Sequence, residues 1–459
     1  MRVVPRILKT IAVLFVVIIF GGAVWLYASP PELLRVGDGY AAKVVCSNVF
    51  IAGRDPDAVL YEDVQAPGNP LLRLVRVAVD REEKRVTARI LGLFAPGYAI
   101  YRGGFGCTAV PDGNFEAATK SVQNLPVTSV SQSNATWPEG DAAASSNDDG
   151  LARLLADKSL IGPAMRAVVV VHNGRIVAEA YGDGFGPKMP LIGWSMTKTV
   201  NAAILGRLML EGKIGFDDAR LLPQWKDGEH AAIRLRDLLG MESGLAFDED
   251  YATVADVTRM LYLDADMTAL PSGLPVKALP GKRFNYSSGT STLIAKIWMD
   301  RLGSGQAALA YPREALFDPL GMTSAVFEVD ARGTFAGSSY LYATAHDWAR
   351  FGQFLLQGGV WEGRRLLPES FVAAMRAPTK ASGGKYTQAQ AWLAAPGGDS
   401  SAEAGLPEDT FWMEGHDGQS VAIVPSANLV VVRLGLTPSR LGYRPQTLVR
   451  EVVAALQKQ

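Results

Sequence analysis

The chain has 459 residues and a formal net charge of -1 at pH 7, with 45 Lys and Arg balanced by 46 Asp and Glu. This length exceeds one ordinary compact unit, so we expect two domains, or one large domain with an appendage. The balanced charge, without a basic stripe interleaved with aromatic residues, excludes attraction to polyanions, and we predict no nucleic-acid binding.

The N-terminus carries the features of a membrane anchor. Arg2, Arg6 and Lys9 precede an uncharged apolar stretch at 11–28, which is ~18 residues and near the minimum for crossing a bilayer. Residues 25–28 (WLYA) match a signal-peptidase site poorly, so we predict that residues 1–29 form an uncleaved anchor. Because the positive flank stays cytoplasmic, the remainder is expected on the periplasmic, extracytoplasmic side.

Residues 30–125 are predicted to form a small β-rich module. Strand-like apolar runs lie at 44–51, 74–79 and 85–91, with a polar turn between the last two. The chain's two cysteines, Cys46 and Cys107, both fall in this module. In an exported chain such a pair predicts a disulfide, and two cysteines without a nearby histidine cannot complete a tetrahedral metal site.

Residues 126–150 are small, polar and rich in turn formers, which predicts a linker to a second domain at 151–459. That domain opens with two strands, 167–171 and 176–181, around an Asn173-Gly174 turn. It closes with strands at 421–424 and 429–434 and a helix at 446–456. Strands at both ends of a helical middle indicate a sheet assembled from distant segments with helices against it.

A serine and a lysine three residues apart, Ser195 and Lys198, stand where a helix should begin, because 199–210 is apolar and rich in helix formers. A helix start offers free N–H groups and a positive dipole end, and the lysine can hold a proton network around the hydroxyl. The same pattern recurs at Ser382 and Lys385 in a glycine-rich turn, with no helix to organise it. The alternative for Ser195 is a helix cap that serves only the backbone.

A proton acceptor for Ser195 is predicted at Tyr286, which follows a Pro-Gly turn and precedes an apolar helix at 291–298. The chain has no G-x-S-x-G elbow, which disfavours an α/β-hydrolase site. A free tyrosine has a pKa of ~10, but the Lys198 ammonium would favour its phenolate, and the two could share a proton. The alternative is a core or capping tyrosine.

The third element is the run Gly415-His416-Asp417-Gly418-Gln419, directly before the strand at 421–424. Glycines beside a strand edge allow a substrate to approach the backbone closely. We expect this edge to supply one N–H of an oxyanion hole, with the Ser195 N–H as the other. His416 taken alone is as compatible with a structural role.

These elements, in this order, resemble the penicillin-recognising serine hydrolases: class C β-lactamases, DD-peptidases and related esterases and amidases. The resemblance covers 151 to the C-terminus, and the Ser195 and His416 motifs are most similar to the aminohexanoate-dimer (nylon-oligomer) hydrolase branch. It implies an α/β (α+β) sandwich, with an antiparallel sheet flanked by helices and a largely helical second subdomain.

The resemblance also implies residue roles. Ser195 would be the acylated nucleophile, Lys198 its proton partner, and Tyr286 the general base that later protonates the leaving group. The N–H groups of Ser195 and Gln419 would form the oxyanion hole. Other substrate-binding positions carried over from the family are His416, Gly418 and Ser288. No metal or cofactor is called for.

Two departures limit the substrate. Ser288 stands where the family's β-lactamases have an asparagine, and His416 replaces the lysine of their K-T-G element. We therefore predict little or no β-lactamase activity and a membrane-anchored serine hydrolase of small esters or amides, including linear amide oligomers. The alternative is a non-catalytic penicillin-binding-type sensor or cell-wall binding protein. No obligate protein partner is evident.

Overall fold

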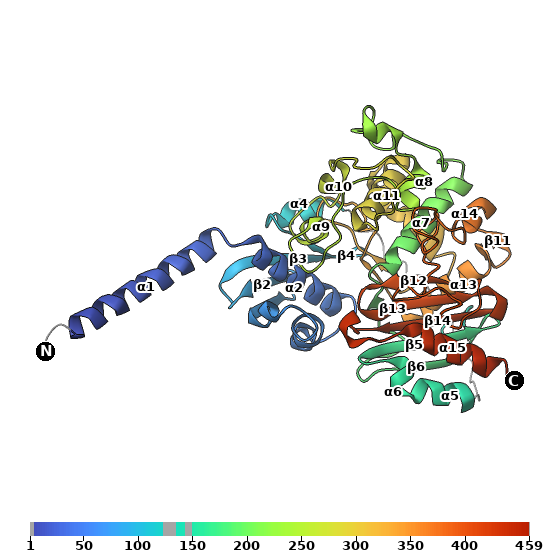
Figure 1. Cartoon of the computed structure of the whole chain (residues 1–459), viewed down its shortest axis with the longest axis horizontal. Helices are drawn as coiled ribbons and strands as arrows, with labels where there is room; N and C mark the ends of the chain where they lie inside the picture. Colours follow the sequence, from blue (N-terminus) through green and yellow to red (C-terminus); the bar gives the residue numbers. More distant parts are fainter. Residues whose placement is uncertain (1–3, 123–134, 143–148, 459) are drawn as a thin grey trace.

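The computed structural model describes residues 4–122, 135–142 and 149–458. Helix α1 (Val4–Ala28) projects away from the folded body (Figure 1). Its segment Lys9–Ala28 has a mean hydropathy of 2.5 and is not buried against any other part of the described chain. By length and composition α1 can cross a membrane, and a signal sequence has the same features.

The N-terminal module is a four-stranded antiparallel sheet covered by one long helix, α2 (Glu32–Phe50). The strands follow the order β1 (Val75–Asp80), β2 (Arg85–Ile90), β3 (Phe94–Arg102) and β4 (Gly106–Ala109). The hairpin predicted around residues 81–84 is confirmed as β1 and β2. The remaining short elements are α3 (Pro56–Val59), η1 (Leu60–Gln65), η2 (Pro70–Leu74) and α4 (Phe115–Lys120).

The strand predicted at 44–51 is wrong, because residues 44–50 form the last turns of α2. From Val36 to Val49 nearly every residue of α2 is buried, since the sheet covers one side and α9 (Asp256–Tyr262) contacts the other. A helix buried all round has no polar face, so its apolar run reads like a buried strand. The predicted disulfide between Cys46 and Cys107 is confirmed and joins α2 to β4.

The second domain contains a five-stranded antiparallel sheet built from both ends of its sequence, as predicted. Its order is β12 (Phe411–Gly415), β13 (Gln419–Val424), β14 (Leu429–Gly435), β5 (Met165–His172) and β6 (Arg175–Tyr181). Val169 and Val171 face the core that contains α13 (Ala345–Leu356), whereas Val168 and Val170 face α15 (Pro445–Leu456). Because successive strand residues point to opposite faces, helices on both sides explain the uninterrupted valine run.

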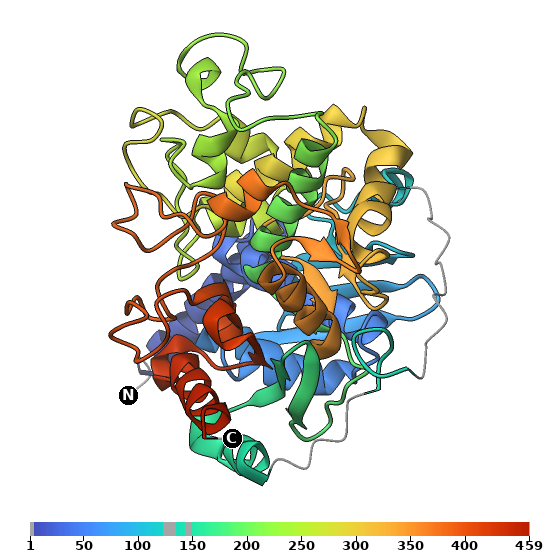
Figure 2. The ribbon, with the colours of Figure 1, turned by 90° about the vertical axis from the view of Figure 1, so that its right-hand side faces the viewer.

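The helical part of this domain stacks above the sheet (Figures 1 and 2). Its two central helices, α7 (Met196–Leu210) and α11 (Ser288–Arg301), pack against each other in the main core. The remaining helices of this domain are η3 (Glu229–Ala232), α8 (Leu235–Leu239), α10 (Ala269–Ser272), α12 (Gly305–Pro312), η4 (Arg313–Phe317) and α14 (Glu369–Ala374), with the turns η5 (His416–Gly418), η6 (Pro425–Ala427) and η7 (Ser439–Leu441). On the opposite side of the sheet, α5 (Asp149–Ala156) and α6 (Lys158–Ile161) pack with α15. Small sheets pair β7 (Leu191–Ile192), β9 (Leu341–Ala343) and β8 (Val326–Phe327), and β10 (Val360–Trp361) with β11 (Arg364–Arg365).

The N-terminal module and the second domain share one apolar core. Val45 and Val49 of α2 belong to the same buried cluster as Trp194, Tyr262 and Tyr340. Of the predicted linker, 126–134 and 143–148 lie outside the described residues, while residues 135–142 pack against the domain. Trp137 is fully buried there, and its indole N–H donates to the His346 carbonyl at 3.3 Å.

Candidate active site

Ser195 stands at the end of a sharp turn between β7 and α7. Trp194 before it has φ of +46°, in the left-handed region that a bulky residue rarely adopts. Gly193 makes the turn possible, because a Cβ there would lie 2.3 Å from the Trp348 ring. Ser195 occupies the N-cap position of α7 without a capping bond from its side chain. The hydroxyl is therefore free of the backbone-capping role that was the alternative for this serine.

Lys198 places its ammonium among three oxygen atoms, one turn into α7. Its Nζ lies 3.0 Å from Ser195 Oγ, 3.1 Å from Ser288 Oγ and 3.0 Å from the Ser338 carbonyl oxygen. The side chain is almost completely buried, and burial lowers the pKa of Lys198 to about 8, against the opposing charge of Glu249. A lysine with this pKa exchanges its proton near neutral pH, as a base for Ser195 must.

Tyr286 meets the same pair from the start of α11. Its ring lies 4.8 Å from Lys198 Nζ, and Ser195 is close enough to act on its hydroxyl and to lower the pKa of Tyr286 in part. Trp392 and Tyr386 pack against it, with ring centroids 5.3 and 5.9 Å away. Burial, followed by the nearby Tyr386 and Glu249, raises the pKa of Tyr286 well above its usual value. This direction is opposite to the lowered pKa that a favoured phenolate requires.

Ser288 lies between Lys198 and an acidic residue that the sequence did not single out, Glu249. The Ser288 hydroxyl donates to Glu249 Oε1 at 2.5 Å, and its backbone N–H donates to Oε2 at 2.7 Å. Tyr251 also contacts this hydroxyl, at 3.3 Å. Ser288 is fully buried. The structure thus places it in the proton network of Lys198 rather than on an open substrate-facing surface.

The sheet edge beside Ser195 is β12, because β13 lies inside the sheet. A Cβ on Gly415 would stand 2.2 Å from the Gly193 carbonyl, so this edge touches the Ser195 turn. Trp412 exchanges hydrogen bonds with Trp392 on the outer side of β12, at 2.9 and 2.8 Å. Since the backbone direction repeats every two residues and Gly415 is extended, the N–H of His416 also points outward.

Gln419 and Gly418 occupy different places from those predicted. Gln419 begins the inner strand β13, where its backbone pairs with Gly415, and its buried side chain bonds both backbone groups of Gly435. Gly418 lies against Arg433, which donates to its carbonyl oxygen at 3.0 Å. Both residues shape the turn after β12, and neither is brought to Ser195 by a contact in the structure.

His416 belongs to an aromatic wall beside Ser195, formed with Trp194 and Tyr251. Its ring stacks on Tyr251, with centroids 5.7 Å apart, and meets Trp194 edge-on at 5.9 Å. The side chain is 54% exposed, so it faces solvent or a ligand rather than the core. Its Nε2 lies 3.4 Å from Asp417 Oδ1.

Glu414 is a second acidic group that sequence reasoning missed. It lies on β12, and burial raises its pKa to about 8. Its Oε1 is buried without a hydrogen-bond partner in the described part of the chain. Its charge, when present, opposes ionisation of Tyr286. The sequence pattern does not predict this, because a charged residue that follows an apolar one in a strand is expected to face solvent unless the packing on both faces of the sheet is known.

The second serine-lysine motif has no such surroundings. The hydroxyl of Ser382 donates to the Thr379 carbonyl at 3.0 Å and accepts from the Tyr386 N–H at 3.1 Å, so it stabilises a turn. Among the described residues no group of three or more His, Cys, Asp or Glu side chains is placed to hold a metal ion. The site around Ser195 is therefore built from a hydroxyl, an amine, a phenol and backbone N–H groups.

Comparison of the sequence with known proteins gives a match to a family profile and a match to a hydrolase. A family profile described as beta-lactamase matches residues 158–450. A 6-aminohexanoate-dimer hydrolase of Paenarthrobacter ureafaciens is 24% identical in an alignment of 321 residues, and the match covers 63% of this chain and 78% of that protein.

Solved structures show the same fold. A Bacillus anthracis protein named for 6-aminohexanoate-dimer hydrolase aligns with a TM-score of 0.55 and 24% identity, over 67% of this chain and 82% of its own. A penicillin-binding protein homologue of Caulobacter crescentus aligns with a TM-score of 0.51 and 16% identity, over 67% and 96% of the two chains. These matches confirm the predicted antiparallel sheet with flanking helices and a helical subdomain.

Proposed function

The chain belongs to the beta-lactamase family, and on that premise we propose that it is a serine hydrolase that cleaves a small ester or amide through an acyl-enzyme on Ser195. The observation that carries the proposal is the contact of Ser195 Oγ with Lys198 Nζ at 3.0 Å, at the start of a helix and beside an open strand edge. Because the hydrolase relative is named for an amide oligomer, linear amides are part of the proposed substrate range.

In the proposed acylation, neutral Lys198 accepts the proton of Ser195 Oγ as the oxygen bonds to the substrate carbonyl carbon. The resulting oxyanion is stabilised by the N–H groups of Ser195 and His416, the first at a helix start and the second on the outward side of β12. This replaces Gln419 as the proposed second donor. In water-poor surroundings each such donor contributes substantially to the rate.

Tyr286 completes the proposed cycle as a general acid, because its raised pKa keeps it protonated. It donates its proton to the leaving oxygen or nitrogen as that bond breaks, and Lys198 returns a proton to it. In deacylation a water attacks the acyl carbon, its proton passes to the Tyr286 and Lys198 pair, and Ser195 regains its hydrogen as the ester bond breaks. Glu249, through Ser288, holds Lys198 in place.

We further propose that α1 remains as an uncleaved anchor with the hydrolase domain outside the cytoplasm. The disulfide between Cys46 and Cys107 supports this side of the membrane, because such bonds persist in oxidising compartments. The measurement is the N-terminal sequence of the protein extracted from membranes: a chain that begins before Val4 supports an anchor, and one that begins near Ser29 supports a cleaved signal.

The function is tested by turnover of a panel of 4-nitrophenyl esters and 4-nitroanilides. Wild type and Ser382→Ala are expected to release product at equal rates, whereas Ser195→Ala loses at least about 10³-fold in kcat. Stoichiometric labelling without release would instead support the sensor alternative. We expect no rapid hydrolysis of a chromogenic cephalosporin, since His416 provides no fixed positive charge for the β-lactam carboxylate.

A further inference from the structure

A cavity of about 350 Å³ lies between the N-terminal module and the hydrolase domain. Most of its lining from the module is apolar and includes Leu34, Leu72 and Ile90. Polar Asn69 also lines it from the module, and charged Asp417 and Arg440 line it from the opposite side. The lining from the hydrolase domain includes the aromatic wall of Trp194, Tyr251 and His416. The volume falls in the range of about 300–1,000 Å³ that small-molecule pockets occupy.

This cavity adjoins the proposed nucleophile. Trp194, which lines it, directly precedes Ser195 in the chain. Tyr251 also lines it, and the Tyr251 hydroxyl lies 3.3 Å from Ser288 Oγ, which is itself 3.1 Å from Lys198 Nζ. A molecule that fills the cavity can therefore place a reacting group beside the aromatic wall.

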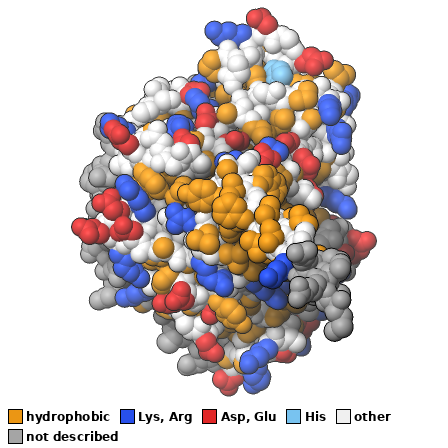
Figure 3. Space-filling model, turned by 90° about the vertical axis from the view of Figure 1, so that its left-hand side faces the viewer, with side chains coloured by type: hydrophobic (Ala, Val, Ile, Leu, Met, Phe, Trp, Pro, Cys, Tyr) orange, Lys and Arg blue, Asp and Glu red, His pale blue; other side chains and the backbone are white. Residues whose placement is uncertain are grey.

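The cavity also adjoins the anchor. Helix α2 begins at Glu32, four residues after α1 ends at Ala28, and Leu33 already lines the cavity. Four residues span at most about 14 Å. Figure 3 looks along α1 onto this face, so the apolar side chains in the middle of the view include those of α1 itself, and charged side chains surround them.

Several leucines on this face are exposed to solvent instead of being buried in a core. Leu33 and Leu71, both on the cavity lining, are each 41% exposed, and nearby Leu91 and Leu93 are 54% and 63% exposed. Single exposed leucines are common on protein surfaces. A group of them beside a cavity and beside the helix proposed to span the membrane indicates a surface that contacts lipid or an apolar ligand.

We propose that this cavity binds the alkyl chain of a membrane-borne amphiphile, and that the substrate is an ester or amide that carries such a chain. The inference rests on the proposed hydrolase function and names the substrate class of the same site. The chain enters from the bilayer beside α1 and lies in the cavity, while the scissile carbonyl reaches Ser195 past the aromatic wall. A partner protein is a poorer occupant, because the space is a cavity of ligand size rather than an extended groove.

The first experiment measures kcat/KM for 4-nitrophenyl esters of increasing acyl length, with the full chain in lipid nanodiscs. Each buried methylene is expected to raise kcat/KM up to about fourfold, from ~0.8 kcal/mol per CH₂, until the cavity is filled. The series is repeated with acetate esters of alcohols of increasing length, because the chain can belong to the acyl or the alcohol part. Lack of length preference in both series would overturn the proposal.

Variants of the lining residues test whether the preference for long chains arises in the cavity. Leu33→Asp and Leu71→Asp change partly exposed lining residues, so the fold tolerates them, and we expect the octanoate-to-acetate ratio of kcat/KM to fall at least tenfold. Leu91→Asp is the matched control, since Leu91 is exposed on the same face but does not line the cavity, and its ratio is expected to stay unchanged. Equal loss in all three variants would assign the preference to the membrane surface and contradict the cavity.

A binding measurement separates failure of this inference from failure of the proposed function. The Ser195→Ala chain in nanodiscs is titrated with a dansyl-labelled undecanoic acid, which needs no turnover. Saturable binding that Leu33→Asp weakens and Leu91→Asp does not supports the cavity even if no ester is cleaved. Absence of that binding overturns the cavity, while short esters still turned over at Ser195 would leave the hydrolase function intact.

A further experiment determines whether the bound alkyl chain belongs to the bulk membrane lipid or to a minor amphiphile. The reconstituted protein is incubated with the bilayer lipid alone, and free fatty acid is measured over time. Release that depends on Ser195 shows that membrane lipid is itself a substrate. Turnover of added long-chain esters without such release assigns the site to a minor amphiphile dissolved in the membrane.

Discussion

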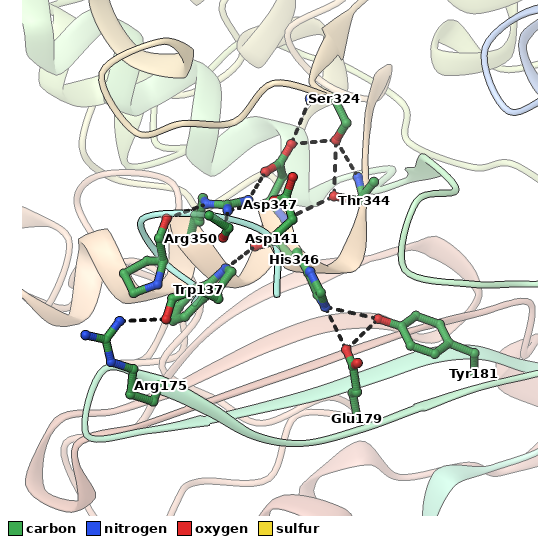
Figure 4. A network of polar contacts seen from close by, with 12 residues as sticks. Trp137, Asp141, Arg175, Glu179, Tyr181, Ser324, Thr344, His346, Asp347 and Arg350 are labelled. Atoms are coloured by element: carbon green, nitrogen blue, oxygen red, sulfur yellow. Dashed lines mark hydrogen bonds and ion pairs between the residues drawn. The ribbon is translucent and has the colours of Figure 1, made fainter. Parts of the chain in front are cut away.

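Two buried ionic networks join other segments to the hydrolase domain: one binds the N-terminal module, and the other binds residues 138–141. They differ in how they contact the turn that carries Ser195. The junction network consists of Lys43, Ser47, Cys107 and Glu328, in which Glu328 accepts from Lys43 at 2.5 Å and from the Cys107 N–H at 2.6 Å. The α13 network consists of Asp141, Ser324, Asp347 and Arg350, in which Arg350 donates to Asp347 at 2.6 Å and to Asp141 at 2.8 Å (Figure 4).

The junction network contacts the aromatic side chains beside the Ser195 turn, residues 193–195. Lys43 Nζ stands 3.8 Å from the centroid of the Tyr340 ring, and that ring lies 6.0 Å from Trp194. The α13 network instead ties residues 137–141 to α13 and to Ser324, with bonds from Arg350 to the Pro138 and Gly140 carbonyls. The comparison teaches that charged groups of the junction network contact the aromatic side chains beside the Ser195 turn directly. Charged groups of the α13 network contact residues 138–141 and Ser324, and α13 meets the Ser195 turn through a different side chain, Trp348, which packs against Gly193.

The largest effect is expected from Glu328→Gln. It leaves the Lys43 ammonium buried without a counter-charge, which costs about 3–5 kcal/mol in the free energy of unfolding. Because Tyr340 and Trp194 repack, acylation of Ser195 also slows. Urea unfolding and single-turnover acylation measure the two effects. The double variant Lys43→Met with Glu328→Leu should recover most of the stability, and a wild-type acylation rate in folded Glu328→Gln would contradict the link to the site.

Arg350→Met is the counterpart in the α13 network. Removing the guanidinium leaves Asp347 buried without its partner, and we expect a loss of about 3 kcal/mol in the free energy of unfolding. Acylation per folded molecule should stay unchanged, because the guanidinium contacts Asp347 and residues 138–141, while Trp348 keeps its packing against Gly193. The same two measurements apply, and slowed acylation well below the unfolding midpoint would remove the distinction between the networks.

The pH dependence of acylation sharpens the comparison further. Burial lowers the pKa of Lys198 to about 8, and the reactive form is the neutral amine, so the rate should rise with pH and level off above about 8. Glu249→Gln removes a charge that raises the pKa of Lys198, so the midpoint of the pH profile should move to a lower pH. Arg350→Met should keep the wild-type midpoint. Stopped-flow acylation across pH 6–10, about two units either side of that pKa, measures this.

The smallest effect is expected at Glu179, which accepts from His346 Nε2 at 2.6 Å and from the Tyr181 hydroxyl at 2.8 Å (Figure 4). Burial alone would raise the pKa of Glu179, but hydrogen bonds from His346 and Tyr181 lower it. The stabilisation is therefore present above the unfolded value and lost as pH falls through the lower folded value. Glu179→Gln should cost about 1 kcal/mol at neutral pH. Thermal unfolding should show the difference from wild type shrinking below pH ~4, where the carboxyl protonates in both states.

The sequence predicted the parts of the site that are close along the chain. Ser195 and Lys198 are three residues apart on one helix, so their contact follows from helix geometry alone. The Asn173-Gly174 hairpin and the closing strands β13 and β14 likewise depend on local turn chemistry.

Contacts between segments that are distant in the sequence could not be predicted from local sequence patterns. Glu249 lies in a loop and reaches Ser288 only when α11 is in place, so its acidic run reads as a solvated surface. The N–H of His416 was overlooked because the order of strands, which makes β12 the edge, is a tertiary property. The same holds for α2, whose helical period disappears when both faces are buried.

The most direct test of the central claim is peptide mass spectrometry of the protein quenched during turnover of 4-nitrophenyl acetate. We predict one acetyl group on the peptide that contains Ser195, which forms within the first turnover and disappears when the ester is exhausted. The Ser382→Ala chain should give the same label, and Ser195→Ala should give none. An acetyl group on another residue at the same rate, or turnover that persists in Ser195→Ala, would contradict the account.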